Sequence, residues 1–251
     1  MRSFDGQWVA ITGAAGGIGQ PVAKLLRRRG ARTICIDRVE TDHCDHSIVA
    51  DLADDAALRN LCQELAADPP DILVNMAGVM RFGLHETQPL DALAQCYRIN
   101  LAVPAALASA VAGPMRARGS GHIVNIGSVL GSIPYPWFAA YSSSKAGLAA
   151  LSQALRRELA GSGVAVTHIS PRAARTPFNS GEVERFLEIA GMKADEPDWV
   201  ARRIVETIAA RKAHLSIGAL ERVYAAVNAL APALIDSGLK SQVRRARAAF
   251  C

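Results

Sequence analysis

Short apolar runs alternate with longer, alanine-rich segments along most of the chain. Six runs are rich in β-branched residues and largely apolar throughout, as in strands that are buried on both faces. They cover residues 8–12, 33–37, 47–50, 72–75, 122–128 and 164–170. Segments with helical spacing separate them, at residues 18–30, 53–67, 101–119 and after Tyr141. The alternation predicts an α/β fold, a doubly wound parallel sheet with helices on both faces.

The pattern changes after residue 218. A short strand pattern at residues 214–218 is followed by apolar positions at helical spacing, which Pro232 interrupts. These positions are Leu220, Val223, Tyr224, Val227, Leu230, Leu234 and Ile235. We predict a helical C-terminal extension over residues 219–251, a hairpin with an apolar face and a basic end. It is either a lid or dimer-packing element, or an element for peripheral lipid contact or for entry of a hydrophobic substrate, since basic amphipathic helices suit anionic membranes.

The length and composition suit one domain. The chain has 251 residues, half of them apolar, which is within the range of a single α/β domain. No apolar run approaches the roughly 18 residues that span a bilayer, and the N-terminus has no secretory pattern. Five scattered cysteines without a C-x-x-C pair suggest neither a zinc site nor a disulfide framework. We expect one domain over residues 1–251, free thiols, no metal and a cytoplasmic location.

Positive charge is concentrated near the C-terminus. The net charge is +5, and residues 201–251 contain nine Lys/Arg and three Asp/Glu, so the first 200 residues are close to neutral. No aromatic residues interleave with a basic stripe and no recognition motif occurs, which argues against a nucleic-acid-binding protein.

A glycine-rich turn follows the first strand. The run VAITGAAGGIGQPVAKLL reads as strand, turn and helix, and Gly13, Gly17 and Gly19 let the backbone approach a pyrophosphate. The spacing T-G-x-x-x-G-x-G differs from the commoner G-x-G-x-x-G, and a plain strand–helix turn is the alternative. Asp37 ends the next strand, where a carboxylate can accept both hydroxyls of an adenosine ribose. A solvated strand-end acid is the weaker alternative.

The residues around Asp37 bear on the choice of dinucleotide. A carboxylate repels a 2′-phosphate, and Ala14 and Ala15 supply no basic partner for one. Arg38 is the one feature that favours NADP. We therefore expect NAD as the preferred cofactor, with NADP as the alternative.

Further motifs follow in the order and at the spacings of a known family. They are Thr12 to Gly19, Asp51-Leu52, the NMAG run from Asn75 to Gly78, Asn100, Ser128, Tyr141-x-x-x-Lys145 and the segment from Pro171 to Thr176. On these residues the chain resembles the short-chain dehydrogenase/reductase family over about residues 5–218. The resemblance implies a Rossmann-like fold, a single dinucleotide-binding catalytic domain and hydride transfer with NAD(P).

The resemblance also implies which residues contact the cofactor. They are Gly13, Gly17, Ile18, Gly19, Asp37, Asp51, Leu52, Asn75, Gly78, Tyr141, Lys145, Pro171 and Thr176. Asp51 and Leu52 would flank the adenine, although ADLADDAAL also reads as a helix N-terminus. Asn75 and Gly78 would line the cofactor floor, unless NMAG is only a strand-to-loop turn. Thr176 would bond the nicotinamide carboxamide.

Four residues carry the implied catalysis: Asn100, Ser128, Tyr141 and Lys145. Tyr141 and Lys145 share a helix face, and the lysine ammonium with the nicotinamide charge would lower the pKa of a phenol that is ordinarily about 10. Tyr141 would take the alcohol proton, or donate it in the reverse direction. Ser128 would donate to the substrate oxygen, and Asn100 would kink a helix and hold a relay water. Taken singly, each would read as a turn former or a surface residue.

One position departs from the resemblance, and one region suggests the substrate. The family usually reads Pro-Gly where this chain has Pro171-Arg172, so Arg172 either faces the substrate or leaves for solvent, and we favour the second. Candidate pocket residues are Met80, His85, residues 133–138, Phe178 and Phe186. They favour a hydrophobic substrate, although any one aromatic could lie in the core or in a subunit interface instead.

The sequence thus predicts an NAD(P)-dependent oxidoreductase that interconverts a hydrophobic secondary alcohol and its ketone. One alternative is an NADPH-preferring carbonyl or 3-oxoacyl reductase. Another, of a different class, is a non-catalytic nucleotide-sensing or scaffold protein, but such a protein has no chemical need for Ser128, Tyr141 and Lys145 together. By the resemblance we expect a homodimer or homotetramer.

Overall fold

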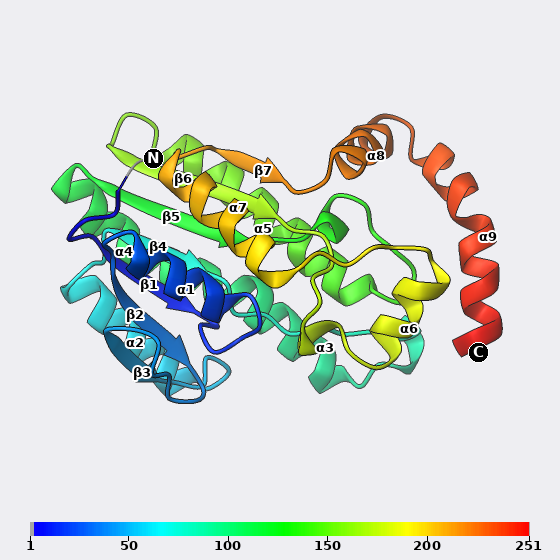
Figure 1. Cartoon of the computed structure of the whole chain (residues 1–251), viewed down its shortest axis with the longest axis horizontal. Helices are drawn as coiled ribbons and strands as arrows, with labels where there is room; N and C mark the ends of the chain where they lie inside the picture. Colours follow the sequence, from blue (N-terminus) through cyan, green and yellow to red (C-terminus); the bar gives the residue numbers. More distant parts are fainter. Residues whose placement is uncertain (1–2, 251) are drawn as a thin grey trace.

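Seven parallel strands form one sheet through the middle of the molecule (Figure 1). The computed structural model describes residues 3–250. The strands are β1 (Trp8–Thr12), β2 (Arg32–Asp37), β3 (His46–Val49), β4 (Ile72–Asn75), β5 (Gly121–Ile126), β6 (Val164–Ser170) and β7 (His214–Ser216). Their order is β3-β2-β1-β4-β5-β6-β7, and every neighbouring pair is parallel. The predicted doubly wound α/β fold is confirmed, with its reversal of strand order between β1 and β4.

Helices cover both faces of the sheet, as the apolar strands required (Figure 1). On one face lie α1 (Gly19–Arg28) and α7 (Pro197–Ala209), and on the other lie α2 (Asp55–Ala67), α4 (Val103–Arg118) and α5 (Ala139–Glu158). All four residues of β4 are buried, since this strand is central and covered on both sides. Each helix contributes an apolar stripe to the core, such as Val22 and Leu26 from α1 against Val200 and Ile204 from α7.

One long helix crosses the sheet before β5. It consists of α3 (Leu90–Tyr97), a π-helical turn (Arg98–Ala102) and α4. By length and composition the segment Leu90–Arg118 is long and apolar enough to span a membrane, with a mean hydropathy of 1.2. The sequence reasoning had found no such run. In this protein the apolar side of the helix packs into the core, where Leu107, Val111 and Met115 are buried against the sheet.

The remaining helices gather beyond the carboxyl ends of the strands (Figure 1). They are α6 (Glu182–Ile189), α8 (Ala219–Leu230), α9 (Pro232–Phe250) and the short 3₁₀ turns η1 (His85–Thr87), η3 (Val129–Gly131) and η4 (Pro177–Asn179). The predicted C-terminal helices are present, and Pro232 opens α9 directly after the break at Ala231. Cys251, the last predicted residue of the extension, lies outside the described residues.

Candidate active site

A cavity of about 1030 Å³ lies beyond the carboxyl ends of the strands. The predicted site residues that line it are Gly13, Gly17, Ile18, Gly19, Asp37, Asp51, Leu52, Gly78, Ser128, Tyr141, Lys145, Pro171 and Thr176. Asn75 and Asn100 are buried behind its surface. Residues spread over most of the chain therefore meet at one edge of the sheet, which is where open α/β sheets place their ligands.

The glycine turn between β1 and α1 forms one wall of this cavity. The Thr12 hydroxyl accepts hydrogen bonds from the backbone N–H groups of Met76 and Ala77, at 3.0 and 3.1 Å, and so joins the ends of β1 and β4. Gly13 has φ +71°, and a Cβ there would lie 2.8 Å from the Ala77 backbone. A Cβ at Gly17 would lie 2.6 Å from Cγ2 of Thr176. Glycine is thus required at these positions for backbone and loop to approach each other closely.

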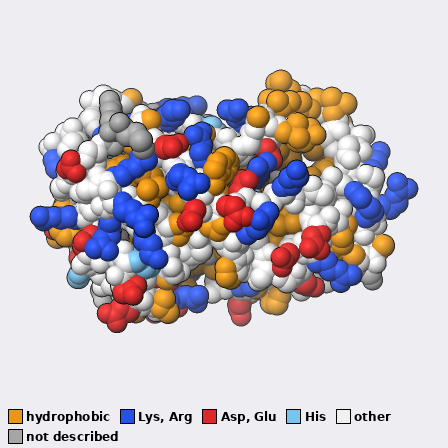
Figure 2. All heavy atoms as spheres, in the orientation of Figure 1, with side chains coloured by type: hydrophobic (Ala, Val, Ile, Leu, Met, Phe, Trp, Pro, Cys, Tyr) orange, Lys and Arg blue, Asp and Glu red, His pale blue; other side chains and the backbone are white. Residues whose placement is uncertain are grey.

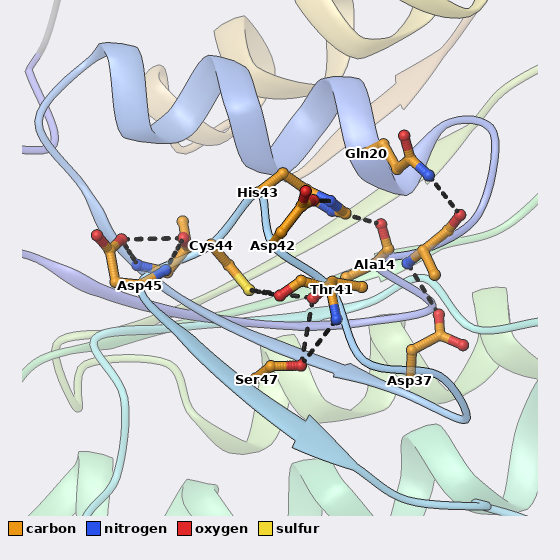
Figure 3. A network of polar contacts seen from close by, with 11 residues as sticks. Ala14, Gln20, Asp37, Thr41, Asp42, His43, Cys44, Asp45 and Ser47 are labelled. Atoms are coloured by element: carbon orange, nitrogen blue, oxygen red, sulfur yellow. Dashed lines mark hydrogen bonds and ion pairs between the residues drawn. The ribbon is translucent and has the colours of Figure 1, made fainter.

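Asp37 sits at the end of β2 and is tied to the glycine turn (Figure 3). Its Oδ2 accepts a hydrogen bond from the Ala15 N–H at 2.9 Å, and its Oδ1 accepts from the Arg38 N–H at 2.7 Å. On the other side of the turn, Gln20 donates to the Ala15 carbonyl, and the buried His43 ring lies 3.1 Å from the Ala14 carbonyl. The carboxylate therefore shapes the turn as well as facing the cavity. Sequence reasoning identified neither Gln20 nor His43, and the role of His43 depends on where the β2–β3 loop folds.

Asp51 and Leu52 line the cavity beside the amino end of α2. The Asp51 carboxylate accepts a hydrogen bond from the Ala53 N–H at 2.9 Å. The N-cap of α2 is Asp54, whose side chain accepts from the Ala57 N–H at 2.7 Å. The predicted helix start in this segment is present, and it leaves the Asp51 side chain at the cavity rather than at the cap.

Asn75 and Asn100 hold the strand end and the loop that follows β4. Asn75 donates to the side chain of Asn125 at 2.8 Å. Asn100 lies in the π-helical turn, and its side chain accepts from the Val79 N–H and donates to the Val79 carbonyl. A Cβ on Gly78 would lie 3.2 Å from Asn100 Oδ1 and 3.6 Å from Lys145 Nζ. Both asparagines fix the cavity floor from behind.

Tyr141 and Lys145 project from the first turns of α5, and Ser128 faces them from the end of β5. Both α5 side chains are buried, at 6% and 4% exposure. Lys145 Nζ donates to the Ile126 carbonyl at 2.9 Å and lies 5.9 Å from the centre of the Tyr141 ring. The strand ends at Ile126, two residues before the predicted end, so Ser128 caps η3 and accepts from the Leu130 N–H at 3.2 Å.

Burial dominates the titration of this pair. It raises the pKa of Tyr141 to about 12, while a hydrogen bond with Ser128 acts in the opposite direction. Burial lowers the pKa of Lys145 to about 8. The sequence reasoning expected the lysine ammonium, together with the nicotinamide charge, to lower the phenol pKa. In the protein alone, burial is the largest influence on that pKa and raises it.

Arg172 differs from its expected position in solvent. Its Nε and Nη2 each donate to a carboxylate oxygen of Asp195 at 2.7 Å, and its Nη1 donates to Glu221 at 3.2 Å. These hydrogen bonds raise the pKa of the guanidinium above its ordinary value, the Asp195 bond most strongly. Asp195 and Glu221 were missed by sequence reasoning, since both lie on segments far along the chain.

The other half of the cavity is mainly apolar. Of the predicted pocket residues, those that line it are Met80, Ile133, Tyr135, Phe138, Phe178 and Phe186. His85 lies on the exposed turn η1, outside the lining. Trp137 packs among aromatic rings, 5.8 Å from Phe186. The C-terminal helices, for which a lid was one of the predicted roles, add a further wall to the cavity: Leu220, Tyr224, Leu234, Ile235 and Leu239.

Comparison with known proteins finds one family throughout. The family model described as short chain dehydrogenase matches residues 7–185. A short chain dehydrogenase from Pseudocercospora fijiensis is 32% identical over 184 residues, and the match covers 67% of this chain and 60% of that longer protein. Galactitol 2-dehydrogenase (L-tagatose-forming) from Cereibacter sphaeroides is 37% identical over 221 residues, covering 79% and 86%. A 3-oxoacyl-(acyl-carrier-protein) reductase from Salmonella typhimurium is 32% identical over 180 residues, covering 67% and 74%.

Solved structures give the same result. A short-chain dehydrogenase from Sphingobium yanoikuyae in complex with NADPH superposes with a TM-score of 0.77 at 27% identity, covering 92% of this chain and 95% of the other. A 4-hydroxyisoleucine dehydrogenase complexed with NADH superposes with a TM-score of 0.74 at 26% identity, covering 84% and 96%.

Proposed function

Because this chain belongs to the short-chain dehydrogenase/reductase family and is an NAD(P)-dependent oxidoreductase acting on CH–OH groups, we propose that it interconverts a hydrophobic secondary alcohol and its ketone. One observation carries the proposal. Ser128, Tyr141 and Lys145 meet in the same cavity as the glycine turn, with apolar side chains lining the half beyond them.

The cavity fits a dinucleotide. A Cβ on Gly19 would lie 2.2 Å from the Gly13 carbonyl oxygen, so glycine at this position allows the turn to close tightly at the start of α1. The pyrophosphate would rest on the N–H groups at the start of α1, the adenosine beside Asp37 and Asp51, and the carboxamide against Thr176. When bound, the nicotinamide supplies the hydride acceptor or donor.

The protein's own residues orient the substrate and move its proton. The Ser128 hydroxyl donates a hydrogen bond to the substrate oxygen and so fixes the reacting carbon. The Tyr141 hydroxyl takes the alcohol proton, or gives one to the ketone oxygen. Lys145 holds its ammonium beside the phenol and the ribose. The positive charge that gathers there must offset the burial that raises the pKa of Tyr141.

NAD is the cofactor we propose as preferred. The support is the carboxylate of Asp37 at the cavity, where a 2′-phosphate would be repelled. Arg38 also lines the cavity and supports NADP as the alternative. Among the similar solved structures, one relative is complexed with NADH and another with NADPH.

The apolar lining supports a hydrophobic substrate. Met80, Ile133, Phe138 and Phe186 would contact groups that water solvates poorly. A second candidate is reduction of a 3-oxoacyl substrate, which the similarity to the Salmonella reductase favours. The third reading, a non-catalytic scaffold, gives no reason for burying a tyrosine and a lysine beside Ser128.

We further propose that the protein is a homodimer or homotetramer. The support is an apolar patch on α8, where Val223 is 57% and Leu230 88% exposed (Figure 2). Peripheral lipid contact is the alternative for the same surface, because α9 carries basic residues nearby. A monomeric mass in light scattering, with binding to anionic vesicles, would contradict the oligomer and favour lipid contact.

A spectrophotometric screen tests the proposed reaction. Secondary alcohols and ketones of increasing apolar size are incubated with NAD(H) and, in parallel, NADP(H), and absorbance is followed at 340 nm. We expect turnover of the larger apolar substrates and a higher kcat/KM with NAD(H) than with NADP(H). Turnover restricted to 3-oxoacyl thioesters with NADPH would favour the second candidate. No turnover of any alcohol or ketone would contradict the proposal.

A further inference from the structure

Arg172 joins three segments that are distant in sequence. It follows Pro171 at the end of β6, and its guanidinium binds Asp195, which lies between α6 and α7, and Glu221, in the first turn of α8. The Asp195 pair is bidentate, with two bonds of 2.7 Å, and the third donor of the same planar group reaches Glu221 at 3.2 Å. A lysine could not hold both acids in this geometry.

The first two segments are already fixed without the arginine. The Asp195 N–H donates to the Ala173 carbonyl at 2.8 Å, and the Arg175 N–H donates to the Asp195 carbonyl at 2.9 Å. The Thr176 side chain packs on Gly17 of the glycine turn. The loop after β6 that carries Arg172 is therefore part of the cofactor half of the cavity.

The third segment depends on polar contacts. No residue of α8 is buried, so the hydrophobic effect does little to hold this helix in place. Among the described residues, two side-chain hydrogen bonds join α8 to the rest of the protein. Glu221 accepts one from Arg172, and Asn228 donates the other to the Ser132 carbonyl at 3.0 Å. The following helix is anchored differently, by the Phe250 ring among aromatic side chains.

The side of α8 that Glu221 fixes is a wall of the cavity. Leu220, Glu221 and Tyr224 all line it, opposite the apolar residues of the β5–α5 loop. Glu221 is largely shielded from solvent, with 23% of its side chain exposed, and Asp195 still more so at 11%. Such a shielded, charge-assisted contact is screened less by salt than an ion pair on the open surface.

We propose that Arg172 is a positioning residue for the reaction: by binding Glu221 it holds α8 against the cofactor-side loop, so that α8 forms a fixed wall for the distal part of the substrate. The inference rests on the proposed function for its substrate, but not for the contact itself. Arg172 is thus a determinant of which substrates bind well, without contacting the reacting atoms.

The test compares Glu221→Gln with Arg222→Gln. Both variants remove one charge from the same turn of α8, but Arg222 is exposed and lies outside the cavity lining. Hydrogen–deuterium exchange of residues 219–230 is measured with NADH present. We expect exchange in Glu221→Gln to be faster by about threefold or more, because local opening becomes easier, and wild-type exchange in Arg222→Gln. Equal exchange in wild type and Glu221→Gln would overturn the inference, whatever reaction the protein catalyses.

Kinetics test the consequence for substrate binding. Decan-2-one is chosen because its long alkyl chain would extend from Tyr141 into the apolar half of the cavity, and butan-2-one because its chain is too short to do so. For Glu221→Gln we expect KM for decan-2-one to rise about threefold to tenfold with kcat within about twofold, and KM for butan-2-one to stay unchanged. Arg172→Lys should give the same split. Equal changes for the two ketones would indicate a general structural defect and overturn the positioning role. Faster exchange without turnover of either ketone by the wild type would count against the proposed function and leave the contact supported.

Discussion

At the scale of residues, the active site places two titratable groups where water cannot hydrate them. Burial raises the pKa of Tyr141 to about 12 and lowers the pKa of Lys145 to about 8. Each shift disfavours the charged form of its group, although Lys145, with a pKa of about 8, is still mainly protonated near neutral pH. Deprotonation of Tyr141 therefore requires positive charge beside the phenol, which Lys145 supplies and a bound nicotinamide would increase.

Gly17 provides a test at this scale. The variant Gly17→Ala places a Cβ 2.6 Å from Cγ2 of Thr176, so the loop after β6 must move away from the glycine turn. Because both segments would contact the dinucleotide, we expect NADH to bind at least about tenfold more weakly. The measurement is a fluorescence titration of NADH.

Gly113 offers a matched control for that variant. It lies on the exposed side of α4, and an added Cβ there meets nothing within 4 Å. Gly113→Ala should leave NADH affinity unchanged and raise the free energy of unfolding by about 0.5–1 kcal/mol, since glycine is costly inside a helix. Wild-type NADH affinity in Gly17→Ala would show that the close approach does not serve cofactor binding.

The residue motifs were readable from the sequence, but their partners were not. Tyr141, Lys145, Ser128 and Thr176 follow a spacing that can be recognised along the chain. Arg172 could be placed only when Asp195 and Glu221 were seen beside it, because folding brings one acid from the loop before α7 and the other from the first turn of α8.

At the scale of elements, β6 carries a histidine that the sheet keeps neutral. The His168 ring lies 3.3 Å from the Ser152 hydroxyl, which accepts a hydrogen bond from Asn125, and Asn125 in turn accepts from Asn75. Burial, with smaller contributions from nearby cations, lowers the pKa of His168 to about 4. Polar groups thus run through the sheet behind the cavity and bond to one another, although Asn75 Oδ1 has no hydrogen-bond partner among the described residues.

This histidine makes stability depend on pH. The unfolded chain binds a proton at His168 with a pKa of about 6.5, whereas the folded chain does so only near 4. The free energy of unfolding therefore falls as the pH drops from about 6.5 toward 4, and His168 accounts for about 2–3 kcal/mol of that loss. Urea unfolding at several pH values measures it, and His168→Gln should have a correspondingly shallower pH dependence.

His85→Gln is the control, because that ring is exposed on η1. In His85→Gln the free energy of unfolding should depend on pH as it does in the wild type. For His168→Gln the comparison concerns the pH dependence, not the absolute stability. An identical pH slope in wild type and His168→Gln would refute the assignment.

Most strands and several helices could be predicted from the sequence, but two helices in the second half of the chain could not. The strands followed from apolar runs, and α1, α2 and α4 from helical spacing. The boundary of β5 was placed two residues late, because Gly127 and Ser128, which follow the last strand residue Ile126, were counted as part of the strand. The sequence reasoning did not predict the helices α6 and α7, which follow the irregular loop after β6.

At the scale of the whole molecule, the sheet order converts separate motifs into one site. The order β3-β2-β1-β4-β5-β6-β7 brings the ends of β1, β4, β5 and β6 to the same edge. Periodicity alone predicts parallel strands but no order, and the family resemblance supplied the rest. The sequence predicted the C-terminal helices, with a lid as one of their roles, but not the contact of Glu221 with Arg172, which joins segments that are distant along the chain.

The proposed role of the Tyr141 hydroxyl in this site is tested most directly by Tyr141→Phe. The variant keeps the ring and its packing, so NADH should bind with an affinity within about twofold of the wild type. Without the hydroxyl no group at that position can carry the proton, and kcat for the best alcohol from the screen, followed at 340 nm, should fall by about 10²–10⁴-fold. Turnover comparable to the wild type at equal NADH affinity would contradict the assignment of this cavity as the site of proton and hydride transfer.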